Sequence, residues 1–94
     1  MMNKYESVII VNPNTDEAGL KALEEKFTGL INENGKVESV ENMGKKKLAY
    51  EIKKFKEGIY LLFNFEAKPD SIKELERVYR ITDEIMKFIV VKKD

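Results

Sequence analysis

The order in which two hydrophobic patterns alternate along the chain is the strongest constraint on its fold. In two segments apolar residues recur at steps of three and four, a spacing typical of helices with one buried side. Four other segments are rich in β-branched and aromatic residues or alternate apolar with polar ones, as strands do. The predicted order is strand, helix, strand, strand, helix, strand. Because the chain has only 94 residues, we expect one domain, residues 1–94, without room for a second core.

The bounds of these segments follow from turn and capping residues. Asn14 or Thr15 is expected to cap the first helix, and Asp70 or Ser71 the second. The expected strands cover residues 5–11, 36–54, 59–66 and 85–91, and the helices carry their buried stripes at Leu20, Leu23, Phe27, Leu30 and Ile31 and at Ile72, Leu75, Val78 and Tyr79.

The long second strand and its hairpin with the third carry further signals. Alternation breaks between Val40 and Gly44, which predicts a bulge or bend there. Phe55–Gly58 is expected to form the hairpin turn. Lys92–Asp94 is expected to be a frayed tail after the last strand.

Two helices and four strands in this order share one core most economically as a single antiparallel sheet with both helices on one face. This is the ferredoxin-like split β-α-β arrangement, an α+β fold. The other sheet face is then open and should be polar. However, Val8 and Ile10 alternate with the equally apolar Ile9 and Val11 in the first strand. The third and last strands also have apolar residues on both faces. Either loops and long side chains such as Lys87 cover this surface, or a protein partner docks on it.

The residue types that are missing exclude several kinds of site. The chain has no cysteine and no histidine, so it has no disulfide, no thiolate metal site and no histidine general base. The adjacent carboxylates Glu24–Glu25 and Asp83–Glu84 are explained more simply as solvated surfaces than as an acid–base pair. We therefore expect neither an enzyme nor a cofactor, a metal or a small-molecule substrate. Residues Met1–Glu6 lead directly into a strand and no apolar run has the length of a membrane span, so we expect a cytoplasmic protein without a membrane partner.

Charge is balanced overall but unevenly distributed. The 17 basic and 17 acidic residues cancel. Between Lys45 and Lys56, however, six lysines face a single acid, Glu51, and the segment has a net charge of +5. Between Asp16 and Glu41, seven acids face three lysines, and the net charge is −4. A domain polarised in this way can present a basic end to RNA while its far side stays acidic.

Two other classes of protein with this fold depend on residues that this chain lacks. Acylphosphatases need an arginine-containing phosphate loop after the first strand, but Asn12–Thr15 has no arginine. The RNA-recognition motif needs a basic residue, glycine and aromatics in its third strand. The matching stretch Glu57–Leu61 keeps only the glycine, so stacking of bases by that code is not expected.

The lysine run itself suits a phosphate backbone. On a strand, Lys45 and Lys47 point to one side and Lys46 to the other. Such an array can straddle phosphates but cannot read base edges well. Each phosphate contact should add about one unit to the salt dependence of binding.

The segment Gly44–Lys53 resembles the Gly-basic-basic-x-Leu-Ala-Tyr-x-Ile signature of the family of the sixth protein of the bacterial small ribosomal subunit. The resemblance runs from Tyr5 to Lys92. Tyr5–Glu6, Asn12–Pro13 and the closing Val90–Lys92 support it. Met43 stands where many relatives have tryptophan and Glu51 where many have proline, and neither change removes a positive charge.

The resemblance implies the same fold and a structural role in the small subunit. It implies binding to small-subunit ribosomal RNA as a heterodimer with the eighteenth small-subunit protein. By position, Tyr50 either packs against a ribose or base or belongs to the core. The expected RNA-binding residues are Lys45, Lys46, Lys47, Tyr50, Lys54, Arg80, Lys87 and Lys92. The alternative is a small ligand-binding or regulatory module of the same fold that forms a homodimer through its open sheet face.

Overall fold

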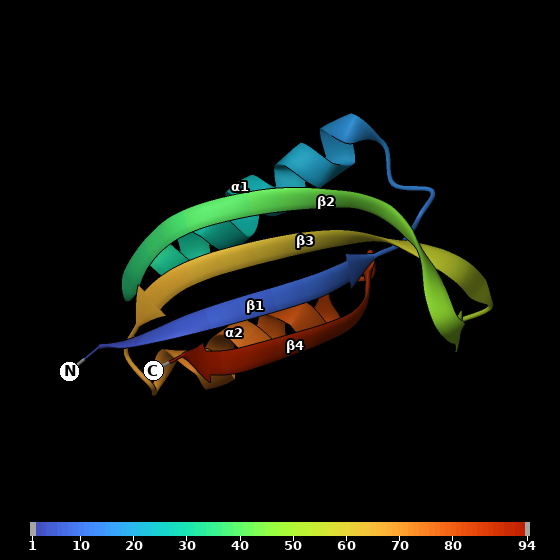
Figure 1. The fold of residues 1–94 in the computed structure, drawn as a ribbon. Coiled ribbons are helices and arrows are strands. Elements are labelled where there is room, and N and C mark those ends of the chain that lie inside the picture. The colour runs from blue at the N-terminus through green and yellow to red at the C-terminus, as the bar shows by residue number, and fades with distance from the viewer. Residues whose placement is uncertain (1, 94) are drawn as a thin grey trace.

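The computed structural model describes residues 2–93 and contains the six elements in the predicted order (Figure 1). They are β1 (Asn3–Val11), α1 (Glu17–Asn32), β2 (Gly35–Ile52), β3 (Phe55–Ala67), α2 (Ser71–Ile81) and β4 (Ile85–Lys93). The strands form one sheet in the order β2-β3-β1-β4, and every neighbouring pair is antiparallel. Both helices cover the same face of this sheet (Figure 1). The predicted ferredoxin-like α+β fold is confirmed.

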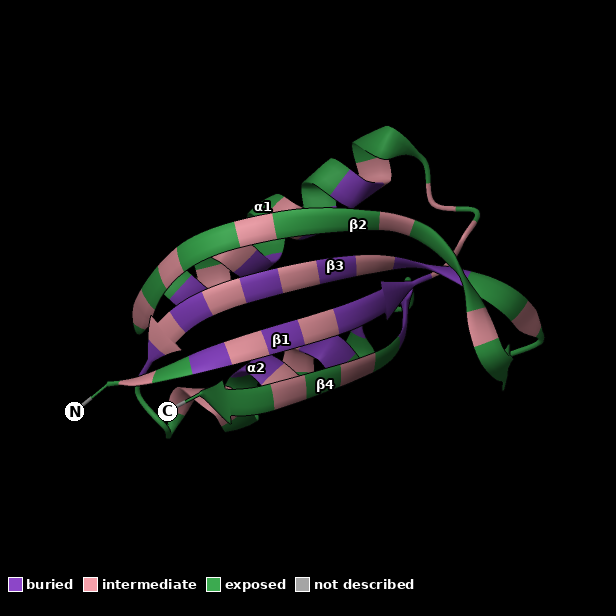
Figure 2. Ribbon diagram, in the orientation of Figure 1, coloured by how far each residue is buried: buried purple, intermediate pink, exposed green. Residues whose placement is uncertain are grey.

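The core lies between the helices and the two central strands. Along β1 and β3 buried residues alternate with half-buried ones (Figure 2). The largest fully buried side chains include Phe63 and Phe65 from β3, Phe27 from α1 and Tyr79 from α2. The ring centroids of Phe27 and Tyr79 are 4.7 Å apart, so the two helices also pack on each other.

A polar contact between β1 and α2 lies within this core. The hydroxyl oxygens of Ser7 in β1 and Tyr79 in α2 are 2.8 Å apart and share a hydrogen bond. Both side chains are almost completely buried, and burial raises the pKa of Tyr79 to about 12. Each hydroxyl satisfies the other where water cannot reach.

The helices begin close to the predicted positions. The N-cap of α1 is Asp16, whose carboxylate accepts a 2.7 Å hydrogen bond from the amide of Gly19. The prediction of Asn14 or Thr15 was therefore wrong by one or two residues. The Asn14 amide instead donates to the Asn12 side chain at 2.8 Å and belongs to the preceding turn. Asp70 is the N-cap of α2, as one of the two predictions had it, although its side chain makes no cap hydrogen bond.

The predicted bulge in β2 is confirmed. The pairing of β2 with β3 shifts register between Asn42 and Gly44, and again between Val37 and Ser39. The Gly44 amide donates a 2.8 Å hydrogen bond to the Asn42 side chain. Gly44 has a φ of 83°, a conformation that glycine adopts without a steric penalty.

The hairpin turn was predicted in the wrong place. Ile52 pairs with Phe55, so the turn consists of Lys53 and Lys54, and Phe55–Gly58 belongs to β3. Lys53 and Lys54 have φ values of 51° and 71°. Asn-Gly is the usual sequence for such a two-residue turn, and the two lysines gave no signal for it.

The last strand is longer than predicted. Strand β4 continues to Lys93, and Lys92 pairs with Tyr5 of β1. The expected frayed tail is therefore wrong for Lys92 and Lys93, while Asp94 lies outside the described residues.

Within residues 2–93, neither helix combines the length and apolar character that crossing a membrane requires.

Candidate nucleic-acid interface

The six lysines of the basic segment all lie at one end of the molecule, in the part of the β2–β3 hairpin beyond the bulge. We call residues 44–58 the hairpin arm. Backbone pairing is lost between Lys47 and Ile52, and the arm bends away from the line of the sheet (Figure 1). All six side chains are exposed: Lys45, Lys46, Lys47, Lys53, Lys54 and Lys56.

The lysine run presents charge on both sides of the arm, as predicted. Lys45 pairs with Ile59, whose side chain lies in the core, whereas Lys46 pairs with Gly58. Residues that pair directly across two strands project to the same face, so Lys45 and Lys46 project to opposite faces. The ammonium group of Lys46 lies 5.6 Å from the ring centroid of Tyr60 on the open face.

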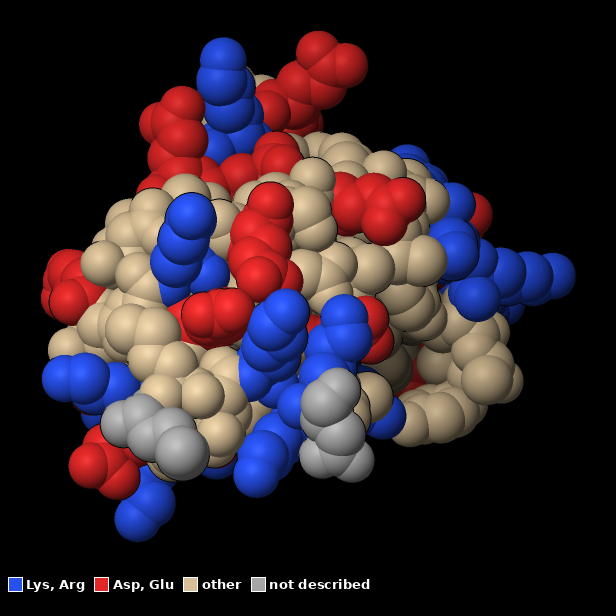
Figure 3. Space-filling view, turned by 60° about the vertical axis from the view of Figure 1, so that its left-hand side comes forward, with Lys and Arg blue, Asp and Glu red and all other residues tan. Residues whose placement is uncertain are grey.

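Acidic side chains do not neutralise the arm. Lys4 and Lys93 pair with Glu38, Glu66 and Glu6 at 3.8–4.0 Å, at the sheet end opposite the arm. Among residues 2–93, no carboxylate lies within ion-pair distance of an arm lysine. In Figure 3 a group of basic side chains projects at the right-hand edge, while elsewhere on this face the two charges are intermixed. A cationic surface therefore remains at this end.

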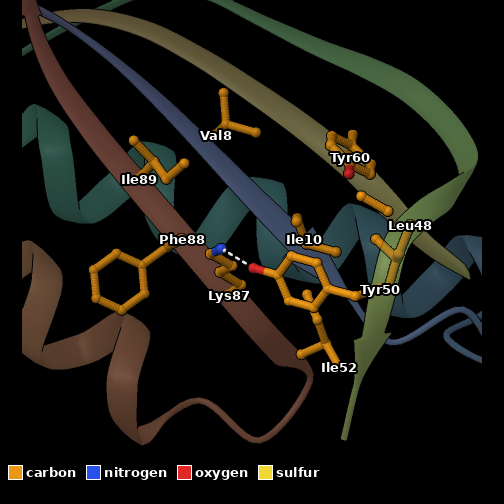
Figure 4. Close-up of a pocket in the computed structure, with 10 residues that line it drawn as sticks. Val8, Ile10, Leu48, Tyr50, Ile52, Tyr60, Lys87, Phe88 and Ile89 are labelled. Carbon is orange, nitrogen blue, oxygen red and sulfur yellow. Dashed lines mark hydrogen bonds between the residues drawn. The ribbon is translucent and has the colours of Figure 1, made fainter. Parts of the chain in front are cut away.

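Tyr50 and Lys87 fasten the arm to the far edge of the sheet. Lys87 of β4 donates a 2.9 Å hydrogen bond to the Tyr50 hydroxyl, and its ammonium group lies 5.4 Å from the centroid of the same ring (Figure 4). The hydrogen bond with Tyr50 raises the pKa of Lys87. Tyr50 is 62% exposed, so the possibility that it belongs to the core is wrong.

A cavity of about 200 Å³ lies beneath the arm on the open face, and all four strands contribute to its lining. Val8, Ile10 and Ile89 come from β1 and β4, and Leu48 and Ile52 come from the arm (Figure 4). The arm and Lys87 thus cover part of the apolar open face. Ile89 and Val91 each remain 51% exposed, so the cover is incomplete.

A second, more polar hollow of about 470 Å³ lies between the turn of the arm, the end of α2 and the start of β4. Lys53, Arg80 and Lys87 all line it. The guanidinium carbon of Arg80 lies 5.6 Å from the ring centroid of Phe88. The structure thus brings Arg80 and Lys87 close to the arm, together with Lys53, which was not among the predicted residues. The sequence signal for Lys53 was its place in the basic segment between Lys45 and Lys56.

The structure separates Lys92 from the other predicted residues. Lys92 pairs with Tyr5 near the sheet end where the ion pairs gather. The arm lies at the other end of a molecule with a longest extent of 40 Å. Lys92 could therefore contact the same RNA only through a distant part of it.

No group of three potential metal-ligating side chains occurs within residues 2–93. The site consists of cations, two tyrosines and apolar surface, without a nucleophile paired to a base. This arrangement can bind anions through its charge and apolar groups through its shape.

Comparison with known proteins identifies the family. Residues 4–92 match the family model described as ribosomal protein S6. The chain is 52% identical to the small ribosomal subunit protein bS6 of Clostridium perfringens strain 13 over 94 residues, which cover 99% of both chains. It is 53% identical to the bS6 protein of Clostridium kluyveri strain NBRC 12016 over 92 residues, which cover 97% of both chains. The crystal structure of 30S ribosomal protein S6 from Thermotoga maritima has a TM-score of 0.92 at 39% identity, covering 99% of this chain and 89% of that one. As the signature at Gly44–Lys53 predicted, the chain belongs to the ribosomal protein S6 family.

Proposed function

We propose that this protein is a structural component of the small ribosomal subunit, and that its hairpin arm binds small-subunit ribosomal RNA. The observation that carries the proposal is the set of six exposed lysines on the arm, none of which has a carboxylate at ion-pair distance within residues 2–93. Family membership supports the ribosomal role, and a ribosomal role places the protein in the cytoplasm.

The arm suits binding to the RNA backbone rather than to bases. Its charges project from both sides of a two-stranded ribbon, and exposed ammonium groups attract phosphates without regard to sequence. The predicted contacts Lys45, Lys46, Lys47 and Lys54 are on the arm, and Arg80 and Lys87 flank it. No catalytic role is part of the proposal.

A second protein is part of the proposed complex. The chain is neutral overall, so the arm alone gives limited long-range attraction to RNA. Ile89 and Val91 also leave apolar surface on the open face, which is typical of a surface that another protein covers. The eighteenth small-subunit protein, implied by the sequence resemblance, is the proposed heterodimer partner.

Mobility shifts of small-subunit ribosomal RNA test the proposal. The isolated protein should bind weakly and lose affinity steeply as salt rises, and the heterodimer should bind tightly. Tight binding that needs neither the partner nor low salt would contradict it.

The exposed apolar surface at Ile89 and Val91 also favours the alternative of a homodimeric ligand-binding or regulatory module. Sedimentation at micromolar concentration separates the two functions. A monomer disfavours the homodimer, while a stable dimer that excludes the partner protein disfavours the ribosomal complex.

A further inference from the structure

We propose that the cavity beneath the arm binds a small aromatic carboxylate, whose ring lies among apolar side chains and whose carboxylate contacts Lys87 and Tyr50. The ligand class is one aromatic ring that carries one short acidic group. This inference goes beyond the proposed RNA-binding function and does not depend on it.

The register of the sheet builds the base of the cavity. Ile10 of β1 pairs with Tyr60 on one side and with Lys87 on the other. Residues that pair directly project to the same face, so these three side chains form one row across the open face. Val8 and Ile89 pair in the neighbouring row and line the same cavity. The base is therefore apolar at its centre, with a hydroxyl at one end of the row and an ammonium group at the other.

The arm covers this base and limits the size of the ligand. Leu48, Tyr50 and Ile52 line the cavity from the arm (Figure 4), and the volume is about 200 Å³. An engineered apolar cavity of about 150 Å³ binds benzene, whereas pockets for drug-sized ligands have about 300–1,000 Å³. One aromatic ring therefore fits, and a larger ligand does not.

The polar groups of the cavity converge and act as donors. The Lys87 ammonium group and the Tyr50 hydroxyl oxygen are 2.9 Å apart, so both can contact the same group of a ligand. Lys87 keeps two further N–H groups, and Tyr50, which accepts in this contact, can still donate its own O–H. The hydrogen bond with Tyr50 is the main cause of the raised pKa of Lys87, and Tyr60 adds a smaller electrostatic effect. The Tyr60 hydroxyl thus acts on the same ammonium group.

The charge of the cavity favours an anion. Among residues 2–93, no aspartate or glutamate lines the cavity, and its charged lining residue is Lys87. Lys46 adds a second positive charge, 5.6 Å from the ring centroid of Tyr60. A carboxylate accepts charge-assisted hydrogen bonds from such donors, and a ring fills the apolar part, where water finds few partners. A ligand with both parts matches the whole cavity.

Nuclear magnetic resonance titrations with phenylacetate, benzyl alcohol and acetate test the site. Phenylacetate should shift the amides of Ile10, Leu48, Tyr60 and Lys87 saturably, with a Kd in the millimolar range or below. Benzyl alcohol has the ring without the charge and should bind at least about tenfold more weakly. Acetate has the charge without the ring and should cause no saturable shift. Equal affinity for phenylacetate and either control, or no saturable shift with phenylacetate, would overturn the proposal.

The contact with Lys87 is tested by Lys87→Met, which keeps the apolar stem and removes the ammonium group. Because this substitution also releases the arm, the measured quantity is the ratio of the affinities for phenylacetate and benzyl alcohol, which loosening alone does not change. The ratio should fall by about tenfold. Lys36→Met removes an exposed charge near the other end of β2 and should leave the ratio unchanged. Equal ratios in the two variants would show that Lys87 does not contact the carboxylate.

The position of the ring is tested by Val8→Phe, which fills the cavity from its base. This variant should lose binding of both phenylacetate and benzyl alcohol, and thermal unfolding checks that it is folded. A folded Val8→Phe protein that binds phenylacetate as the wild type does would place the ligand outside the cavity and overturn the proposal.

Discussion

The hydroxyl of Tyr50 accepts a 2.9 Å hydrogen bond from the ammonium group of Lys87, 37 residues further along the chain. Tyr50 is in β2 and Lys87 in β4, which are the two edge strands of the sheet. The contact therefore holds the arm over the open face. It acts in the part of β2 beyond Lys47, where the backbone pairing with β3 is interrupted. This exposed side-chain contact positions the arm where strand pairing does not.

Replacing Tyr50 with phenylalanine should loosen the arm without unfolding the protein. The variant keeps the ring that covers the cavity and loses only the hydrogen bond to Lys87. Amides of residues 48–56 should exchange with solvent faster, while the midpoint of thermal unfolding stays nearly constant because local opening needs less free energy than global unfolding. Tyr60→Phe is the matched control, since its hydroxyl has no hydrogen-bond partner among residues 2–93. Equal exchange in the two variants would show that the contact does not hold the arm.

Stability should fall between pH 10 and pH 12 because of Tyr79. Its pKa is about 12 in the folded protein, against an ordinary value of 10. The folded state therefore favours the protonated phenol, and this stabilisation is complete below pH 10 and lost as pH rises through 12. The free energy of unfolding in urea should drop by about 2 kcal/mol across this range.

The control for this pH effect is Tyr79→Phe, which cannot ionise. This variant should be less stable by about 1 kcal/mol at neutral pH, because the Ser7 hydroxyl loses its buried partner. It should then show a smaller decline above pH 10 than the wild type. Parallel pH curves for the two proteins would assign the decline to other groups.

Changing Lys53–Lys54 to Asn–Gly should stabilise the protein and weaken RNA binding. Both lysines have positive φ values, and each L-residue in that region has a penalty of about 1–2 kcal/mol that glycine avoids and asparagine reduces. We expect the free energy of unfolding to rise by about 1 kcal/mol. An Ala–Ala variant removes the same charges without relieving the backbone and should not gain stability. Equal stability of the two variants would show that the turn is not strained.

Two glycines should respond to alanine in opposite directions. A Cβ at Gly35 would overlap the backbone oxygen of Glu66 and lie 2.8 Å from the Cα of Ala67, so Gly35→Ala should lower stability by on the order of 3 kcal/mol. A Cβ at Gly29, inside α1, meets nothing within 4 Å, and Gly29→Ala should add about 0.5–1 kcal/mol. Urea unfolding measures both changes. A stable Gly35→Ala protein would contradict the close approach of the first residue of β2 to the end of β3.

Periodicity predicted the core well because burial on one side of a helix or strand is a local pattern. Four residues of the predicted α1 stripe are buried, and Leu30 is partly buried against them: Leu20, Leu23, Phe27 and Ile31. The turn at Lys53–Lys54 could not be predicted in this way, because neither residue favours it. The cross-sheet contact of Tyr50 with Lys87 could not be predicted either, since it depends on how far the arm bends. The lysine run itself was visible, but its freedom from carboxylates depends on where Glu6, Glu38 and Glu66 lie in the fold.

The most direct test of the account is the salt dependence of the affinity of the heterodimer for small-subunit ribosomal RNA when Lys45, Lys46 and Lys47 are changed to alanine. The control changes three exposed lysines away from the arm, Lys21, Lys36 and Lys73, and removes the same charge. The arm variant should lower the salt slope by about two to three units with nearly unchanged thermal stability, and the control should change it by less than about one. Equal slopes for the two variants, or loss of folding in the arm variant alone, would contradict an arm that binds RNA through unpaired positive charge.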